Sequence, residues 1–289
     1  MLDLLFSVLL TGILFLVFKG FNAFKIDNLQ AIIVNYIVAF SIGFSMSNST
    51  VSFSEIPSQP WFIGTLVLGA LFITVFNVLA LTTQRFGFSV VSVASKMSLV
   101  IPVVFAVFMY GDILNGAKII GLLLALLAVY FITKRKEDSQ DFDKRQLYLP
   151  LALFIGAGVL DTLLNYIETT YVGSSEFELF TATIFMVAGV FGLLVMLVRI
   201  VVFKKKCIIN AKNILGGICL GVPNYFSIYY LLKALNTEGI SSATIFTINN
   251  VAVVLLATII GLLFFKERLS RLNWLGAILS ILAILMFYL

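Results

Sequence analysis

Long apolar runs separated by short polar connectors dominate the pattern of this 289-residue chain. Each run is continuous, unlike the strands of a membrane barrel, which alternate in polarity at every second residue. A helix that crosses the hydrocarbon core of a bilayer needs about 20 predominantly apolar residues. By this measure the sequence predicts ten spanning helices, namely Leu2–Phe18, Leu29–Met46, Trp61–Thr82, Phe88–Tyr110, Leu114–Thr133, Tyr148–Ile167, Leu179–Phe203, Asn213–Leu232, Ser241–Phe265 and Leu272–Tyr288.

The composition is typical of a membrane protein. Of the 289 residues, 61% are hydrophobic and only 11% are charged, whereas soluble domains carry roughly 25% charged residues. We therefore predict an all-α polytopic membrane protein surrounded by a lipid bilayer. The first apolar run begins with an acidic residue, Asp3, and lacks the basic start and cleavage site of a signal peptide, so we interpret it as a retained span.

The residue types that most often bind metals or perform catalysis are scarce. The chain has no histidine, and its two cysteines, Cys207 and Cys219, show neither zinc-like spacing nor the density of a disulfide framework. We therefore expect no metal, no cofactor and no enzymatic activity. The net charge of +5 resides in short connectors beside the spans, which is typical of topology signals rather than of a nucleic-acid surface.

The chain divides into two similar halves. Its longest polar connector, KRKEDSQDFDKR at 134–145, lies at the midpoint. Each half holds five predicted spans, an odd number, so the second half must insert in the opposite orientation to the first. We therefore predict a five-helix repeat at 1–133, a polar linker at 134–146 and an inverted five-helix repeat at 147–289, an architecture that is frequent in transporters.

Matching residues support the duplication. Two offsets align the halves, 152 residues through the third span and the turn after it, and 155 residues beyond that point. The change in offset indicates that span nine is longer than span four by about one helical turn. The aligned pairs include Gly64 with Gly216, Gly69 with Gly221, Gly87 with Gly239, Gly121 with Gly276, and Asp112 with Glu267.

Two segments resemble a known carrier family. ALTTQRFGFSVVSVASKMSLVIPVVFAVFMYGD at 80–112 and ALNTEGISSATIFTINNVAVVLLATIIGLLFFKERLS at 234–270 are similar to the repeats of EamA-like carriers in the drug/metabolite transporter superfamily. FKERLS at 265–270 is the part most similar to the family pattern, whereas Asp112 stands where the family usually has glutamate. The resemblance covers nearly the whole chain and implies a transporter, but it does not indicate the substrate.

The basic residues lie almost entirely on one side of the predicted membrane. Those in and beside the connectors after spans one, three, five, seven and nine form one set, and only Lys118 and Lys233 fall on the opposite side. The positive-inside rule places the larger set in the cytoplasm. We therefore predict a protein integral to a membrane, of the bacterial inner membrane type, with both termini on the extracytoplasmic side.

Lys96 is the one charged residue within the apolar run Phe88–Tyr110. A lysine near the centre of a spanning helix costs about 2.5–3.5 kcal/mol on insertion scales, so it normally faces a cavity or a partner. We interpret Lys96 as a cationic anchor for an anionic or zwitterionic substrate. A structural ion pair or a wide aqueous vestibule would also accommodate it.

Span six carries two acids, Asp161 and Glu168, which are seven residues apart and therefore lie on roughly the same helix face. Carboxylates within spans often serve in proton relays. We therefore name Asp161 and Glu168 as the ion-coupling candidates, with Asp161 the stronger. A permanent Lys96–Asp161 pair and exposure of Asp161 to solvent are the alternatives.

Amides and tyrosines gather in spans eight and nine, in PNYFSIYY at 223–230 and TINNVAV at 247–253. Polar groups with aromatic walls are typical of small-molecule sites, although amides also form hydrogen bonds between membrane helices. Asn77 in span three aligns with Tyr229 at the first offset. The predicted substrate-binding residues are Lys96, Asn77, Asn224, Tyr225, Tyr229 and Asn250.

Together these features predict a secondary active transporter that moves a small organic metabolite, such as an amino acid or a similar amphiphilic solute, by alternating access. The sequence shows no nucleotide-binding loop, so exchange or a proton gradient would drive transport. An exporter of hydrophobic drugs or lipid-like compounds is the main alternative, and a polytopic membrane enzyme acting on lipid is a distant one. A homo-oligomer is compatible with the sequence. The acids Asp112 and Glu267 are expected at helix ends, in structural or gating roles.

Overall fold

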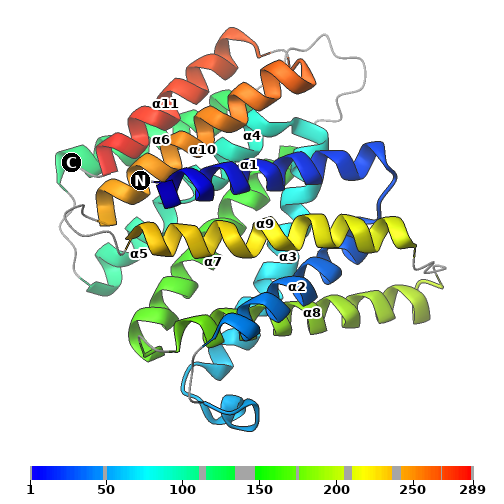
Figure 1. Ribbon diagram of the computed structural model, residues 1–289. Helices are drawn as coiled ribbons and strands as arrows, with labels where there is room; N and C mark the ends of the chain where they lie inside the picture. The colour runs from blue at the N-terminus through cyan, green and yellow to red at the C-terminus, as the bar shows by residue number, and fades with distance from the viewer. Residues whose placement is uncertain are drawn as a thin grey trace. The chain divides into compact units, whose positions relative to one another are not determined.

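The computed structural model describes residues 2–47, 51–110, 115–133, 147–173, 176–204, 210–235, 242–267 and 269–287 (Figure 1). In these residues the regular secondary structure consists of helices joined by turns and short connectors. Nine segments in this part of the chain are helices long and apolar enough to cross a membrane, and Arg271–Met286 is a shorter apolar helix. The membrane-helix character is therefore confirmed, while the count of ten spans and their inverted arrangement stay predictions. The helices are α1 (Leu2–Ala23), α2 (Asn28–Met46), the 3-10 helix η1 (Phe53–Ser58), α3 (Phe62–Phe86), α4 (Phe88–Met97), α5 (Val100–Tyr110), α6 (Gly116–Thr133), α7 (Tyr148–Tyr171), α8 (Phe177–Val201), α9 (Ala211–Leu235), α10 (Ser242–Phe265) and α11 (Arg271–Phe287).

The chain forms two compact units, each built from segments that are far apart in sequence. Unit 1 consists of Met1–Phe15, Val78–Val159 and Ser227–Leu289, and unit 2 of Leu16–Asn77 and Leu160–Phe226. Each unit draws on both predicted halves, and the divisions fall within α1, α3, α7 and α9. The units therefore divide the chain differently from the predicted repeats, which remain a prediction about duplication.

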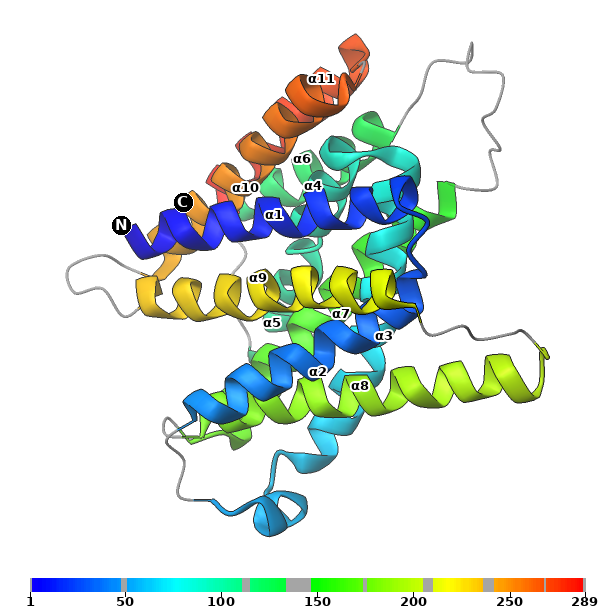
Figure 2. The ribbon, with the colours of Figure 1, turned by 45° about the vertical axis from the view of Figure 1, so that its right-hand side comes forward.

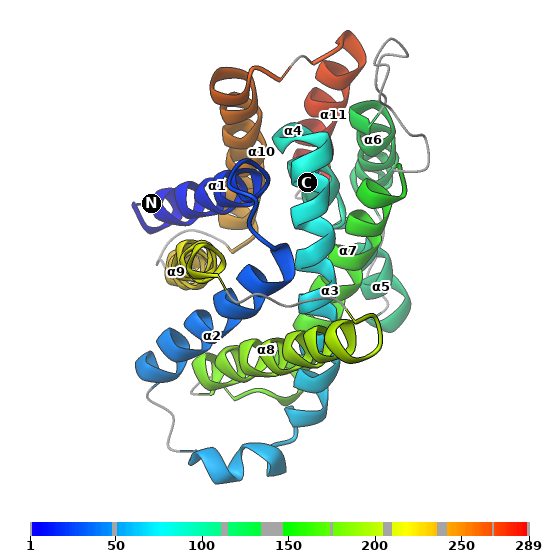
Figure 3. The same cartoon turned by 90° about the vertical axis from the view of Figure 1, so that its right-hand side faces the viewer.

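In unit 1, α6 and α11 lie side by side (Figure 3). Their backbones approach closely at Gly276, where an added Cβ would lie 2.6 Å from the Ile132 nitrogen and 2.9 Å from the Ala128 oxygen. Beyond this contact, Asn273 Nδ2 donates hydrogen bonds to the carbonyls of Ile132 at 2.8 Å and Phe131 at 3.2 Å. These carbonyls lie in the last turn of α6, which has no further helical N–H to bind, so α11 both packs against α6 and caps it.

In unit 2, α2 packs along α8 (Figure 2). Tyr36 stacks on Phe185 with a centroid distance of 6.0 Å, and its hydroxyl donates to the Phe72 oxygen of α3 at 2.9 Å. Directly before α3, the fully buried Trp61 donates through Nε1 to Glu176 Oε2 at 2.9 Å. The polar tips of the large aromatic side chains are thus satisfied where they are buried, as their burial requires.

The predicted span Phe88–Tyr110 is present but interrupted. The helix ends at Met97, turns through Ser98 and Leu99, and starts again as α5 at Val100. Pro102 has no N–H to donate to the Ser98 carbonyl four residues before it, so that carbonyl accepts from Ile101 N at 2.9 Å instead. Apolar periodicity predicted one uninterrupted helix here, and that detail was wrong because Pro102 sits in the first turn of a second helix.

Replacing Gly276 by alanine should destabilise the protein, because the new methyl group meets backbone atoms of α6 that cannot move aside. We expect a loss of about 1–3 kcal/mol, as in other overpacked contacts, measured as a lower Tm of the purified protein in detergent. The matched control is Gly116→Ala at the start of α6, where an added Cβ would meet nothing within 4 Å. A Gly276→Ala protein as stable as Gly116→Ala would contradict the close packing of α6 and α11.

Candidate functional site

Lys96 lies in the last turn of α4, directly before the interruption, and its side chain is partly buried. A cation at this position interacts favourably with the negative end of the α4 dipole. The N-terminus of α5, the positive end of a second helix dipole, begins at Val100, four residues later. The interruption therefore brings a charged side chain and two helix ends together inside an apolar segment of unit 1.

A ladder of serines accompanies Lys96 along α4. Ser92 donates to the Ser89 carbonyl at 3.1 Å, Ser95 donates to the Ser92 carbonyl at 3.2 Å, and Ser98 donates to the Ser95 carbonyl. Hydroxyls that bond backward to their own helix satisfy themselves but bend and loosen it. The α4 helix is consequently a polar, weakened segment. The sequence analysis missed this ladder, although four serines at intervals of three residues were the available signal.

Glu267 closes the N-terminus of α4. Its carboxylate accepts from Phe88 N at 2.8 Å and from the Ser89 hydroxyl at 3.3 Å. Gly87, with a φ of +88°, and Gly261 leave room for this carboxylate, since a Cβ on either glycine would collide with it. Glu267 thus lies at a helix end, as expected, and its role there is to cap α4; its predicted counterpart Asp112 lies outside the described residues.

Two further predicted residues belong to unit 1. Tyr229 is partly buried and packs edge-on against Tyr230 with a centroid distance of 5.4 Å, and Asn250 is partly buried in α10. The neighbouring Asn249 is more deeply buried, with 3% of its surface exposed, and its Oδ1 has no hydrogen-bond partner among the described residues. The sequence analysis missed Asn249, although the adjacent amides of TINN were the available signal.

Three predicted binding residues belong to unit 2. Asn77 Nδ2 donates to the Ile73 carbonyl of its own helix at 2.7 Å. Asn224, with 3% exposed, donates through Nδ2 to Asn35 Oδ1 of α2 at 3.1 Å. Tyr225 is buried against Gly43, where an added Cβ would lie 2.9 Å from its ring. The structure therefore brings Asn224 and Tyr225 to α2, and it adds Asn35, which the sequence analysis did not name.

The acids of span six also lie in unit 2. Asp161 is near the middle of α7 and its side chain is exposed, whereas Glu168 is partly buried near the end of the helix. Ionisable residues at membrane depth almost always face the bundle interior or a water-filled cavity. The coupling role of Asp161, the Lys96–Asp161 pair and the exposure of Asp161 to solvent all stay predictions.

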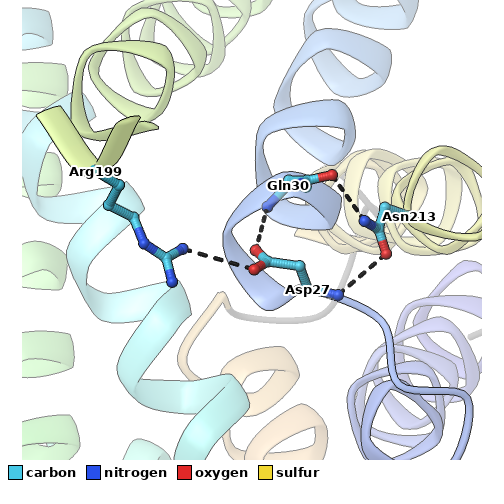
Figure 4. Close-up of polar contacts among 4 residues, drawn as sticks. All are labelled: Asp27, Gln30, Arg199 and Asn213. Atoms are coloured by element: carbon cyan, nitrogen blue, oxygen red, sulfur yellow. Dashed lines mark hydrogen bonds and ion pairs between the residues drawn. The ribbon is translucent and has the colours of Figure 1, made fainter. Parts of the chain in front are cut away.

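A cluster of polar side chains ties three helices of unit 2 together (Figure 4). Asp27 caps α2 by accepting from Gln30 N at 3.1 Å, and its Oδ2 lies 3.7 Å from Arg199 Nη1 of α8. Asn213 of α9 accepts from Asp27 N at 3.1 Å and donates to Gln30 Oε1 at 2.7 Å. This Asp27 cluster lies at the helix ends that the basic residues predict to be cytoplasmic. In the sequence, this cluster was indicated only by Asp27 followed three residues later by Gln30, a pattern typical of the start of a helix.

Metal ligands do not gather within the described part of the chain, where no group of three or more His, Cys, Asp or Glu side chains lies close enough to hold an ion.

Comparison with known proteins supports the fold but not a function. No protein-family model matches the chain. It is 29% identical over 294 residues to an uncharacterized protein of Haemophilus influenzae, with 99% of this chain and 97% of that protein covered. A solved crystal structure is similar with a TM-score of 0.64 at 15% sequence identity, over 99% of this chain and 94% of that chain. The similarity to EamA-like carriers thus stays a prediction.

Removing the Glu267 carboxylate should destabilise α4, because two donors at its N-terminus lose their acceptor. We expect Glu267→Ala to cost about 0.5–2 kcal/mol, as for other N-terminal caps, with Glu267→Gln intermediate because it retains one acceptor oxygen. Thermal unfolding in detergent measures both. Glu178→Ala, at an exposed acid in the first turn of α8, serves as the control, and an equal effect at both positions would argue against the cap.

Proposed function

We propose that this protein is a secondary active transporter of a small organic solute that carries a carboxylate or similar anionic group. It works by alternating access in a membrane of the bacterial inner membrane type. The observation that carries the proposal is Lys96 at the interrupted span, where α4 ends and α5 begins. Broken helices at membrane depth are tolerated where they are buried in protein or line a cavity, and they commonly form the substrate sites of transporters.

The charges at this interruption select the ligand class. The Lys96 ammonium favours an anionic group. The described residues of α10 carry no basic residue before Lys266, so a second cation of the kind expected for a phosphate clamp is lacking there. A carboxylate of an amino acid or related amphiphile fits a single cation better than a phosphate group does.

Helix pairing within each unit supports the inverted repeat. α6 packs with α11 and α4 with α10 in unit 1, and α2 packs with α8 in unit 2. In the predicted duplication these are the fifth and tenth, the fourth and ninth, and the second and seventh spans. A pseudo-two-fold relation between the halves would pair equivalent helices in this way, as transporters built from inverted repeats do.

Ligand-dependent thermal shifts of the purified protein test the proposal. We expect phenylalanine or 3-phenylpropionate to raise the Tm, because a ligand at about 100 times its Kd stabilises the folded state by about 2.7 kcal/mol. Lys96→Gln should abolish the shift, whereas Lys212→Gln, at an exposed lysine of α9, should retain it. Stabilisation by tetraphenylphosphonium alone would favour the drug exporter, and a Lys96→Gln protein with normal shifts but a lower ligand-free Tm would make Lys96 structural.

Proton coupling is assigned to Asp161, because it is a carboxylate near the middle of a spanning helix, where carboxylates often serve in proton relays. In proteoliposomes, Asp161→Asn should lose accumulation driven by a pH gradient while it retains exchange of labelled for unlabelled substrate, since exchange needs no net proton movement. Glu178→Gln should retain both activities. Accumulation by Asp161→Asn at the wild-type level would rule out Asp161 as the coupling residue.

A further inference from the structure

A pair of asparagine amides lies inside unit 2, between α2 and α9. Asn35 is completely buried and Asn224 is 3% exposed, and the Nδ2 of Asn224 donates to the Oδ1 of Asn35 at 3.1 Å. The Nδ2 of Asn35 has no hydrogen-bond partner among the described residues. One amide of the pair is therefore oriented by its neighbour, while its own donor points to no acceptor.

The pair lies where α2 and α9 approach each other closely. Gly217 and Gly221 place the backbone of α9 directly against α2, so that a Cβ on Gly221 would lie 2.8 Å from the backbone oxygen of Asn35. A Cβ on Gly217 would similarly lie 2.6 Å from the Ala31 oxygen. Pro223, next to Asn224, also removes one backbone N–H from α9 and loosens the helix at this level.

An unsatisfied buried donor is costly. Leaving such a group without an acceptor is unfavourable, and more than about 90% of buried polar groups in proteins have a partner. An apolar residue of similar size at position 35 would avoid the cost.

We propose that Asn35 and Asn224 form a subsite that binds an acceptor oxygen of the transported solute, a carboxylate or carbonyl oxygen, when α2 and α9 separate. Asn224 holds the Oδ1 of Asn35, so both hydrogens of Asn35 Nδ2 are presented to the ligand. This inference rests on the proposed transport function.

Cysteine accessibility tests the opening without knowledge of the substrate. In a Cys207→Ser and Cys219→Ser background, Asn35→Cys should react with N-ethylmaleimide in native membranes, because water must reach a site that admits solute. Thr183→Cys, at a buried position of α8, should stay unreactive under the same conditions. An Asn35→Cys protein as unreactive as Thr183→Cys would overturn the proposal.

Ligand affinity tests the chemistry. Asn35→Leu should weaken the thermal-shift response to phenylalanine and 3-phenylpropionate at least tenfold, but it should not alter any response to phenethylamine, which has no carboxylate. Its ligand-free Tm should fall less than that of Asn213→Leu, which removes an amide engaged in two hydrogen bonds. Wild-type affinity in Asn35→Leu, or a Tm loss equal to that of Asn213→Leu with affinity retained, would overturn the subsite.

The transport function and the subsite fail in different ways. If none of these compounds stabilises the wild type, the proposed substrate class is wrong, and the reactivity of Asn35→Cys then decides alone whether the subsite opens. If they stabilise the wild type through Lys96 but Asn35→Leu responds normally, the transporter stands and the subsite is rejected.

Discussion

Close approach of helix backbones at glycine is the interaction on which the rest of the structure depends. Lipid exerts no hydrophobic force between two apolar helices, so their association relies on van der Waals packing and on hydrogen bonds. Gly276 provides the packing between α6 and α11, and Gly217 with Gly221 provides it between α9 and α2. In each pair the helices are close enough for one helix to reach the polar groups of the other.

That proximity determines where polar groups can be satisfied. Asn273 reaches the terminal carbonyls of α6 because Gly276 brings α11 against it. Glu267 reaches the first N–H groups of α4 because Gly87 and Gly261 leave space for its carboxylate. The same close approach of α9 to α2 brings Asn224 Nδ2 to Asn35 Oδ1, while Asn35 Nδ2 has no partner among the described residues.

The positions of the helices could be predicted from the sequence, because a continuous apolar run of about 20 residues has the length that a helix needs to cross a bilayer. The runs ending at Phe265 and Thr133 match the ends of α10 and α6. Apolar periodicity does not register a single proline in a helix's first turn, so the interruption before Pro102 was missed. It also underestimated α3, which continues through Gln84 and Arg85 to Phe86 because helical hydrogen bonding can extend beyond the apolar core.

The candidate site could be predicted only in part. A charged residue inside an apolar run can be recognised from the sequence, and so Lys96 and Asp161 were apparent. The role of an amide cannot be recognised in this way, because an asparagine with hydrogen-bond partners and one without them look alike in sequence. Asn77 bonds to its own helix, whereas Asn35 and Asn249 each retain a buried polar atom without a partner in the described part of the chain. The difference depends on the facing helix, which the local sequence does not contain.

The contacts of α2 and α9 also give the proposed opening a direction. At the Asp27 cluster the two helices are joined by hydrogen bonds between Asn213 and both Asp27 and Gln30. Farther along, Asn35 and Asn224 share one hydrogen bond and leave a donor unused. The proposed separation would therefore break fewer of these side-chain hydrogen bonds at the Asn35–Asn224 pair than at the cluster, and Pro223 loosens α9 near that pair. If the basic residues mark the cytoplasmic side, α2 and α9 open toward the opposite face while the Asp27 cluster acts as the hinge.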